Sequence, residues 1–259
     1  MFKRVCSLAF SPCGSAKKVS NLVALEIAKK FGIELNEINF TLPDERSKEI
    51  IFSPDDLLVI ASPTYAGKLP NKIMPDFKEK IKGQGTTCVA ITIFGNRSFD
   101  NSLAELKSIL CENGFNICAG AAIHTKHSMA HIGFLDEQSV IDFANKIDFE
   151  KKDINVPGDA NAPYYVPKQL NGDIAKFLPA KPKTDKEKCK ACKLCVKLCP
   201  MGSIDFSDVS NIPGICIKCH ACVNLCPEKA KYFDDPQLLS HIKMLKANFQ
   251  GPCDSKFFI

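Results

Sequence analysis

Two cysteine-rich segments in the C-terminal third of the chain have residue types and spacing that suit metal chemistry. The first reads C-K-A-C-K-L-C-V-K-L-C-P over residues 189–200, and the second reads C-I-K-C-H-A-C-V-N-L-C-P over residues 216–227. All four cysteines and the proline of the first segment recur in the second at the same spacing. Thiolate sulfur is a metal ligand and a redox-active group. The doubled segment therefore predicts two metal or redox centres.

The spacing within each segment favours iron–sulfur cubes. Three thiolates on a tight loop, each separated from the next by two other residues, converge on three corners of one cube. The N–H groups of the loop stabilise the negative charge of the cube. The fourth cysteine lies too far round to reach the same cube, and the proline after it turns the chain. The run C-x2-C-x2-C-x3-C-P resembles that of two-cluster bacterial ferredoxins, in which the fourth cysteine ligates the other cluster.

This resemblance implies a crossed set of ligands for two [4Fe–4S] clusters. One cluster takes Cys189, Cys192, Cys195 and Cys226, and the other takes Cys216, Cys219, Cys222 and Cys199. The alternative is a pair of zinc sites. Zinc sites usually show two separated C-x2-C pairs for each metal, so the doubled four-cysteine pattern disfavours zinc.

The hydrophobic content and the cysteine count narrow the class of protein. The chain has 259 residues, 45% of them hydrophobic and 14 of them cysteine. Its longest apolar runs, residues 88–94 and 117–123, are far shorter than the ~20 residues that span a bilayer. The first residues lack the pattern of a secretory signal. We therefore expect a cytoplasmic protein without a membrane span. In the cytoplasm, cysteines are not expected to form structural disulfides.

The N-terminal part shows strand and helix patterns in alternation. Continuous apolar runs predict strands over residues 3–10, 56–62, 86–94 and 115–123, and a weaker one over 33–39. Helical spacing of apolar residues predicts helices over residues 17–31, 71–82, 101–113 and 137–149. The pattern predicts an α/β fold with a five-stranded parallel sheet and helices on both faces.

Composition divides the chain into four parts. Residues 1–150 form the expected α/β domain, and residues 184–235 form a small α+β two-cluster domain. Five prolines mark residues 151–183 as a linker or as an extended segment draped over the first domain. Tyr164 and Tyr165 within it are expected to pack on that domain, with shielding of a cofactor as the alternative. Residues 236–259 form a tail with a short helix.

Three loops follow the carboxyl ends of expected neighbouring strands, where open α/β sheets bind ligands. The first, residues 11–17, has hydroxyl groups and a glycine before a helix and suits a phosphate; a simple turn with a helix cap is the alternative. The others are residues 62–70 and 94–100. Here the chain resembles flavodoxins, and over nearly its whole length the flavodoxin–ferredoxin fusion proteins of anaerobic bacteria and archaea.

The resemblance implies an FMN site. Its phosphate would be held by the loop that contains Ser11, Cys13, Gly14, Ser15, Ala16 and Lys17. One side of the flavin ring would border Pro63, Thr64, Tyr65, Ala66 and Gly67, with Tyr65 able to stack. The other edge would lie near Phe94, Gly95, Asn96, Arg97 and Asp100. For Arg97, a surface charge is the alternative.

Two residues of the phosphate loop depart from the flavodoxin pattern. Cys13 and Ala16 stand where threonines are typical, so two hydroxyl donors are lost. At a helix N-terminus the pKa of Cys13 is expected to be lowered when the site is empty. We expect His220 at the surface near a cluster, and the loop of His124, His127 and His131 has no assigned role.

The net charge of +5 at first favours nucleic acid or an anionic membrane as a partner. Two oxidised clusters with their thiolates carry roughly −2 each, and a flavin phosphate removes about two more charges. The loaded protein would lie near −1, so we expect no nucleic-acid partner. The lysines that lie among the cysteines either compensate the negative charge of the clusters or form a solvated face.

The combined interpretation is an electron-transfer iron–sulfur flavoprotein with FMN and two [4Fe–4S] clusters. No side chain is a candidate acid, base or nucleophile, so we predict no catalytic residue. The main alternative is a flavin-dependent reductase of a small substrate or NAD(P)H, and a further one is a redox-sensing binding protein. Redox proteins are the expected partners, and a homodimer remains open.

Overall fold

A mostly parallel β-sheet forms the centre of the N-terminal part of the protein. The computed structural model describes residues 2–251 and 253–259. Five strands pair in parallel: β1 (Arg4–Ala9), β2 (Leu35–Asn39), β4 (Asp56–Pro63), β6 (Thr86–Phe94) and β7 (Phe115–His124). Their spatial order is β2-β1-β4-β6-β7. Counted along the chain this is the 2-1-3-4-5 order of flavodoxin-like sheets, which confirms the expected fold.

The structure adds a sixth strand that the sequence does not predict. β10 (Lys256–Phe258) comes from the C-terminal tail and pairs antiparallel with β7, so that Phe257 lies opposite Ala121. The three residues of β10 are too few to show a strand period. The tail thus returns to the edge of the first domain's sheet.

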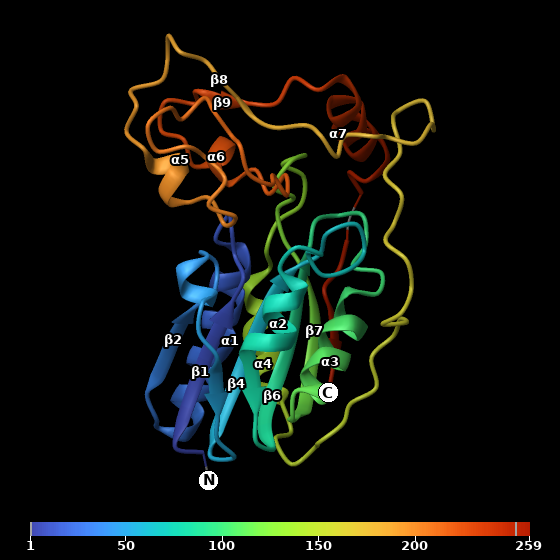
Figure 1. The fold of residues 1–259 in the computed structure, drawn as a ribbon. Helices are drawn as coiled ribbons and strands as arrows, with labels where there is room; N and C mark the ends of the chain where they lie inside the picture. Colours follow the sequence, from blue (N-terminus) through green and yellow to red (C-terminus); the bar gives the residue numbers. More distant parts are fainter. Residues whose placement is uncertain (1, 252) are drawn as a thin grey trace.

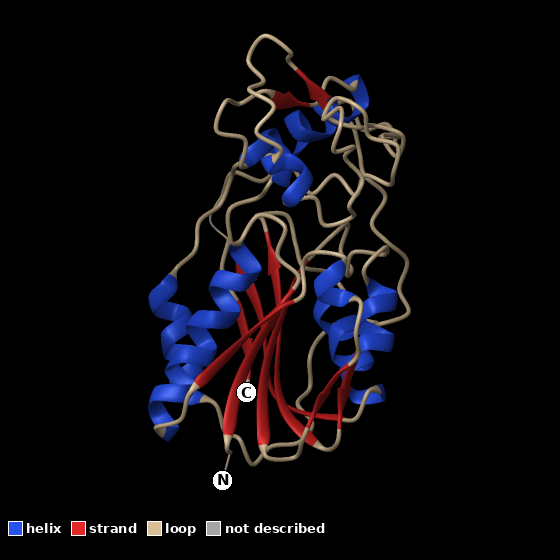
Figure 2. Cartoon of the chain, turned by 60° about the vertical axis from the view of Figure 1, so that its left-hand side comes forward, coloured by secondary structure: helices blue, strands red, loops and turns tan. Residues whose placement is uncertain are grey.

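Helices cover both faces of the sheet, as Figure 2 shows. Helices α1 (Ser15–Phe31) and α4 (Glu137–Lys146) pack on one face, and α2 (Met74–Lys80) and α3 (Ser102–Glu112) on the other. The remaining elements are a 3-10 turn η1 (Asp44–Arg46) and a two-stranded parallel sheet of β3 (Ile50–Phe52) and β5 (Ile81–Gly83). The helix expected over 71–82 is shorter because Ile81 and Lys82 pair in this small sheet.

Alternation along the strands builds two hydrophobic cores. In β1 the buried residues Val5 and Ala9 join the core under α1 and α4, whereas Cys6 and Leu8 join the core on the opposite face. The buried thiol of Cys6 therefore packs as a small apolar group, as expected. α1 ends where Gly32 adopts a left-handed conformation, a conformation that glycine adopts without a steric penalty.

The C-terminal region lies beyond the carboxyl ends of the parallel strands (Figure 1). It contains β8 (Lys183–Thr184), α5 (Leu194–Lys197), α6 (Ala221–Asn224), β9 (Lys231–Tyr232) and α7 (Pro236–Asn248). Before it, residues 151–182 form no helix and only isolated β-bridges, one of which pairs Lys168 with Ile174. Ile154 of this segment packs into the core beneath α3. No helix within residues 2–251 or 253–259 is long and apolar enough to cross a membrane.

Candidate functional site

The two cysteine segments have the same backbone conformation. Left-handed residues recur at equivalent places: Ala191 and Lys218 (φ 51° and 54°), Lys193 and His220 (63° in both), and Gly202 and Lys229 (59° and 49°). The short helices α5 and α6 occupy equivalent places as well. Left-handed residues alternating with right-handed ones turn successive N–H groups toward a common centre and favour bound anions. The sequence repeat is therefore also a repeat of backbone conformation.

Backbone N–H groups donate to the fourth thiol of each segment. The N–H of Ser203 lies 3.3 Å from Sγ of Cys199, and the N–H of Ala230 lies 3.3 Å from Sγ of Cys226. A hydrogen bond to the charged form of a group stabilises that form. These donors suit thiolates that ligate a metal cluster.

Thiols of the two cysteine segments lie near one another. Burial, together with the nearby charges of Cys216, Cys199 and Cys195, raises the pKa of Cys222 to about 12. Cys222 of the second segment therefore lies near Cys195 and Cys199 of the first, and all three border one apolar cluster. Within the described residues, no three His, Cys, Asp or Glu side chains converge as ligands of a single metal ion. The fit to cubes rests on the grouping of the thiols and on their N–H donors.

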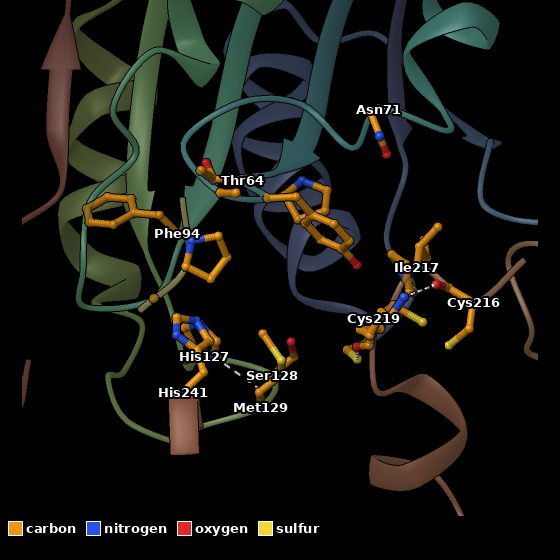
Figure 3. Close-up of a pocket in the computed structure, with 18 of the residues that line it drawn as sticks. Thr64, Asn71, Phe94, His127, Ser128, Met129, Cys216, Ile217, Cys219 and His241 are labelled. Carbon is orange, nitrogen blue, oxygen red and sulfur yellow. Dashed lines mark hydrogen bonds between the residues drawn. The ribbon is translucent and has the colours of Figure 1, made fainter. Parts of the chain in front are cut away.

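A cavity of about 1180 Å³ separates the second cysteine segment from the α/β domain (Figure 3). Cys216 and Cys219 line one side, and the loops after β1, β4 and β6 line the other. Most of the predicted FMN residues line this cavity: Ser11, Cys13, Ser15, Ala16, Pro63, Thr64, Tyr65, Ala66, Gly67, Phe94, Gly95 and Arg97. Gly14, Lys17, Asn96 and Asp100 do not.

The loop after β1 leaves a helix N-terminus open toward the cavity. Gly14 is left-handed at φ 89° and is the N-cap residue of α1, where it provides no side-chain hydrogen bond to the first helical turn. The N–H of Lys17 donates to Oγ of Ser11 at 2.9 Å, which leaves this amide unavailable to a ligand. The Lys17 ammonium contacts Asn39 and Glu37 instead. The available donors of this loop lie at Ser15 and Ala16.

The loop after β4 is a tight turn that presents Tyr65 to the cavity. Tyr65 and Lys68 exchange backbone hydrogen bonds, and both central residues, Ala66 and Gly67, have positive φ. A side chain at Gly67 would collide with the carboxylate of Asp100. Burial raises the pKa of Tyr65 well above its usual value, and the nearby Cys219, Cys13 and Cys216 add to the rise. Tyr65 thus lies between the α/β domain and the second cysteine segment.

The loop after β6 is held by contacts that the sequence does not reveal. Arg97 pairs with Asp100, and its guanidinium lies over the ring of Tyr165, 4.1 Å from the centroid. Arg97 is therefore not a solvated surface charge. The Asn96 side chain turns away from the cavity, hydrogen-bonds to His124 and donates to the carbonyl oxygen of Gly251 at 3.0 Å. Its amide holds the C-terminal tail.

Cys13 differs from its expected chemistry. Its thiol donates to the carbonyl oxygen of Cys219 at 3.2 Å, and burial raises its pKa. The expectation of a lowered pKa was wrong because the second cysteine segment covers the thiol and removes it from water. His220 is a second correction: it is buried and stacked on Phe233, with its Nε2 unpaired among the described residues.

Other cavity residues were missed by the sequence analysis. They come from the loop after β7, the proline-rich segment and α7, and include His127, Met129, Phe177 and His241. The loop after β7 is also at a strand's carboxyl end, so the topological rule could have included His127. No local signal marks His241, which lies on a helix beyond the cysteine segments. Tyr164 and Tyr165 contact the first domain and line the cavity.

The residues that line the cavity fit a flavin nucleotide. The cavity is larger than the ~300–1,000 Å³ of usual small-molecule pockets. At the start of α1, the N–H groups of Ser15 and Ala16 have no hydrogen-bond partner among residues 2–251 and 253–259 and suit a phosphate. The half-buried Tyr65 and Tyr165 suit a planar ring. The chemistry of the lining agrees with the FMN site that the resemblance implies.

Family models match both cysteine segments. A 4Fe-4S binding domain model matches residues 182–205, and a second model with the same description matches residues 213–230. The C-terminal region is of the 4Fe-4S ferredoxin type. The chain therefore combines a flavodoxin-like strand order in its N-terminal part with two 4Fe-4S binding domain matches in its C-terminal part. No curated protein gave a significant match.

Solved structures similar to the N-terminal part include a flavodoxin, a putative flavoprotein and a rubredoxin oxygen:oxidoreductase. A flavodoxin from the domain Archaea is 15% identical, with a TM-score of 0.38, over 54% of this chain and 93% of its own. A putative flavoprotein from Bacteroides uniformis is 15% identical, with a TM-score of 0.39, over 56% and 100%. Rubredoxin oxygen:oxidoreductase from Desulfovibrio gigas is 15% identical, with a TM-score of 0.35, over 56% and 35%.

Proposed function

We propose that this protein transfers electrons between FMN, bound in the cavity, and two [4Fe–4S] clusters on the doubled cysteine segment, and from there to redox partners. One observation carries the proposal. Cys216 and Cys219 line the same cavity as the loops after β1, β4 and β6. When bound, FMN exchanges one or two electrons and each cluster exchanges one.

The chain's own residues provide the binding and the exclusion of water. The helix N-terminus at Ser15 and Ala16 would hold the phosphate, and Tyr65 would lie against the ring on the side of Cys219. Phe177 and Met129 add apolar walls. Apolar side chains around the redox centres would reduce their contact with water and lower the local dielectric.

Metal and flavin content test the proposal directly. The full chain, purified without oxygen, is expected to contain about eight iron atoms, matching acid-labile sulfide and about one FMN per chain. Reduction of the flavin by an added donor should be accompanied by the spectroscopic signals of reduced clusters. Colourless protein, or protein that contains only zinc, would contradict the proposal.

The surface around the first cysteine segment favours an acidic redox partner. Cys192 is exposed, and Lys186, Lys190 and Lys197 around it are exposed as well. A positive patch steers an acidic partner by long-range attraction that salt screens. Electron transfer to such a partner is expected to slow as salt rises. A cytoplasmic location and the absence of a nucleic-acid partner remain part of the proposal, and a homodimer stays open.

A reductase activity is the second candidate, because the cavity exceeds the usual size for a single ligand. In that case a nicotinamide or another small substrate would bind beside the flavin. Rapid bleaching of the flavin on anaerobic mixing with NAD(P)H would favour the reductase. An unchanged flavin spectrum would favour transfer from a protein donor.

A further inference from the structure

His127 offers a fixed hydrogen-bond donor at one end of the cavity. Its Nδ1 accepts the backbone N–H groups of Met129 and Ala130 at 3.1 and 3.2 Å. A nitrogen that accepts two N–H groups carries no proton, so in the neutral ring the proton is on Nε2. Burial lowers the pKa of His127 to about 4, so the ring is neutral near pH 7. His127 therefore presents an Nε2–H donor.

His241 offers the opposite group. Its Nδ1 lies 2.7 Å from the carbonyl oxygen of Lys168. A carbonyl oxygen only accepts, so Nδ1 carries the proton and Nε2 of the neutral ring is an acceptor. Burial lowers the pKa of His241 as well, which favours the neutral ring.

The two imidazoles belong to the same end of one cavity. Both line it, and each lies close enough that the charge of His241 lowers the pKa of His127. Figure 3 shows the pair beside Ser128 and Met129, away from Cys216 and Cys219. Within residues 2–251 and 253–259, no protein group hydrogen-bonds to either Nε2 atom. A neutral donor and a neutral acceptor thus remain without protein partners.

We propose that Nε2 of His127 and Nε2 of His241 bind the edge of a planar amide or imide, which presents a C=O group beside an N–H group. His127 donates to the carbonyl oxygen, and His241 accepts from the N–H. Two ligands of redox proteins have such an edge: the pyrimidine ring of a flavin and the carboxamide of a nicotinamide. The flavin source rests on the proposed function, whereas the nicotinamide source can be tested without it.

The position of His127 fits either source. A Cβ atom on Gly95 would lie 2.5 Å from Cβ of His127, so His127 packs directly on the loop that is expected to border the flavin ring. Met129 and Phe177 provide apolar walls nearby. In such surroundings a polar edge of a ligand gains from each hydrogen bond and loses when its partner is missing.

Ligand pairs that differ only in the N–H group test the proposal. The full chain with its clusters, stripped of flavin, is titrated with FMN and with FMN methylated at N3. It is also titrated with oxidised NAD and with its 3-acetylpyridine analogue, which keeps the carbonyl and lacks the amide N–H. The wild type is expected to bind the N–H member about two- to tenfold more tightly, which is the effect of one hydrogen bond.

Substitutions assign this preference to the pair. His241→Leu should bind both members of the pair equally, and His241→Gln, which keeps an acceptor, should retain part of the preference. His127→Leu should weaken both members by a similar factor, because both keep the carbonyl. His131→Asn is the control: His131 also lines the cavity, and asparagine tolerates its positive φ of 57°.

The outcomes distinguish between the flavin and the nicotinamide as the ligand of the two histidines. A preference within the flavin pair that His241→Leu abolishes supports the flavin edge, and the same result within the nicotinamide pair supports the carboxamide. If FMN does not bind at all, the proposed function fails while the nicotinamide pair still tests the site. The inference is overturned if the wild type shows no preference in either pair, or if the preference survives in His241→Leu.

Discussion

The thiol of Cys13 donates to the carbonyl oxygen of Cys219 at 3.2 Å, although the two residues belong to different domains. Nδ2 of Asn224 lies 3.7 Å from the same sulfur and 2.9 Å from the carbonyl oxygen of Ser128. On the far side of the interface, Arg46 donates to the carbonyl oxygen of Pro200 at 2.9 Å. The contacts of Cys13 and Asn224 hold the second cysteine segment over the loops that border the cavity. The contact of Arg46 instead holds the end of the first cysteine segment.

The burial of Cys13 predicts slow alkylation of its thiol. Its raised pKa keeps the thiolate fraction low at pH 8, and Cys219 and Asn224 cover the sulfur. In cluster-loaded protein without flavin, Cys13 should react with iodoacetamide more slowly than the exposed Cys111, as followed by peptide mass spectrometry. If Cys13 were modified faster than Cys111, the pKa of Cys13 would be lowered, as expected from the sequence.

Crossed ligation predicts that the fourth cysteine of each segment serves the other segment's cluster. Cys199→Ala and Cys219→Ala should disturb the same cluster, and each variant should lose up to about four of about eight irons. Combining Cys199→Ala with Cys192→Ala should disturb both clusters. Iron analysis and electron paramagnetic resonance of the reduced protein measure this, with Cys111→Ala as the control. Equal effects of Cys199→Ala and Cys192→Ala on one cluster would indicate uncrossed ligation.

The added edge strand predicts a stabilising role for Phe257. Its ring stacks on Phe143, with centroids 5.1 Å apart, against the core under α1 and α4. Phe257→Ala should lower the free energy of unfolding by about 2 kcal/mol through lost burial and stacking. Urea unfolding followed by circular dichroism measures the change. Ile259→Ala, at an exposed neighbouring position, should change it by less than about 0.5 kcal/mol.

The lowered pKa of His127 predicts a loss of stability in acid. The unfolded chain binds a proton near pH 6.5, whereas the folded ring binds one only near pH 4. Between these values the unfolded state holds more protons, so stability falls as the pH falls from 6.5 toward 4. The His127→Asn variant keeps an acceptor for the N–H groups of Met129 and Ala130. It should reduce the number of protons taken up on unfolding by up to about one, and the free energy of unfolding should then depend less on pH.

The urea midpoint of cluster absorbance, measured without oxygen from pH 7.5 to 5.5, checks this prediction. Ser128→Ala changes the same loop without removing a titrating group, so its curve should run parallel to that of the wild type. If His127→Asn also ran parallel to the wild type, His127 would not be the group that takes up the proton.

Local signals were sufficient to identify the two cysteine segments as 4Fe-4S binding motifs and to predict most elements of the sheet. The repeated spacing of the cysteines is visible in the sequence. The structure shows the same repeat in its backbone, where the equivalent residues Lys193 and His220 are both left-handed. Buried parallel strands such as β4 and β6 are continuous apolar runs, which a single sequence shows directly. The edge strand β10 carries no such run, because its pairing with β7 depends on a contact between distant segments.

The side-chain roles around the cavity could not be predicted in the same way. Asn96 lies in an expected ligand loop but binds the C-terminal tail, and Arg97 is taken by Asp100 and Tyr165. Cys13 has a raised pKa because a segment two hundred residues away covers it. Each of these depends on which segment packs against the loop, and spacing in the sequence does not contain that information.

The sequence by itself determined the metal chemistry and the parallel α/β fold, since ligand spacing and apolar periodicity are local properties of a chain. Only the tertiary structure decided that the second cysteine segment, rather than the first, faces the cavity, and that His127 and His241 meet at its end. The physical reason is that burial, hydrogen-bond partners and ring tautomers are set by contacts between segments, which form only when the chain is folded.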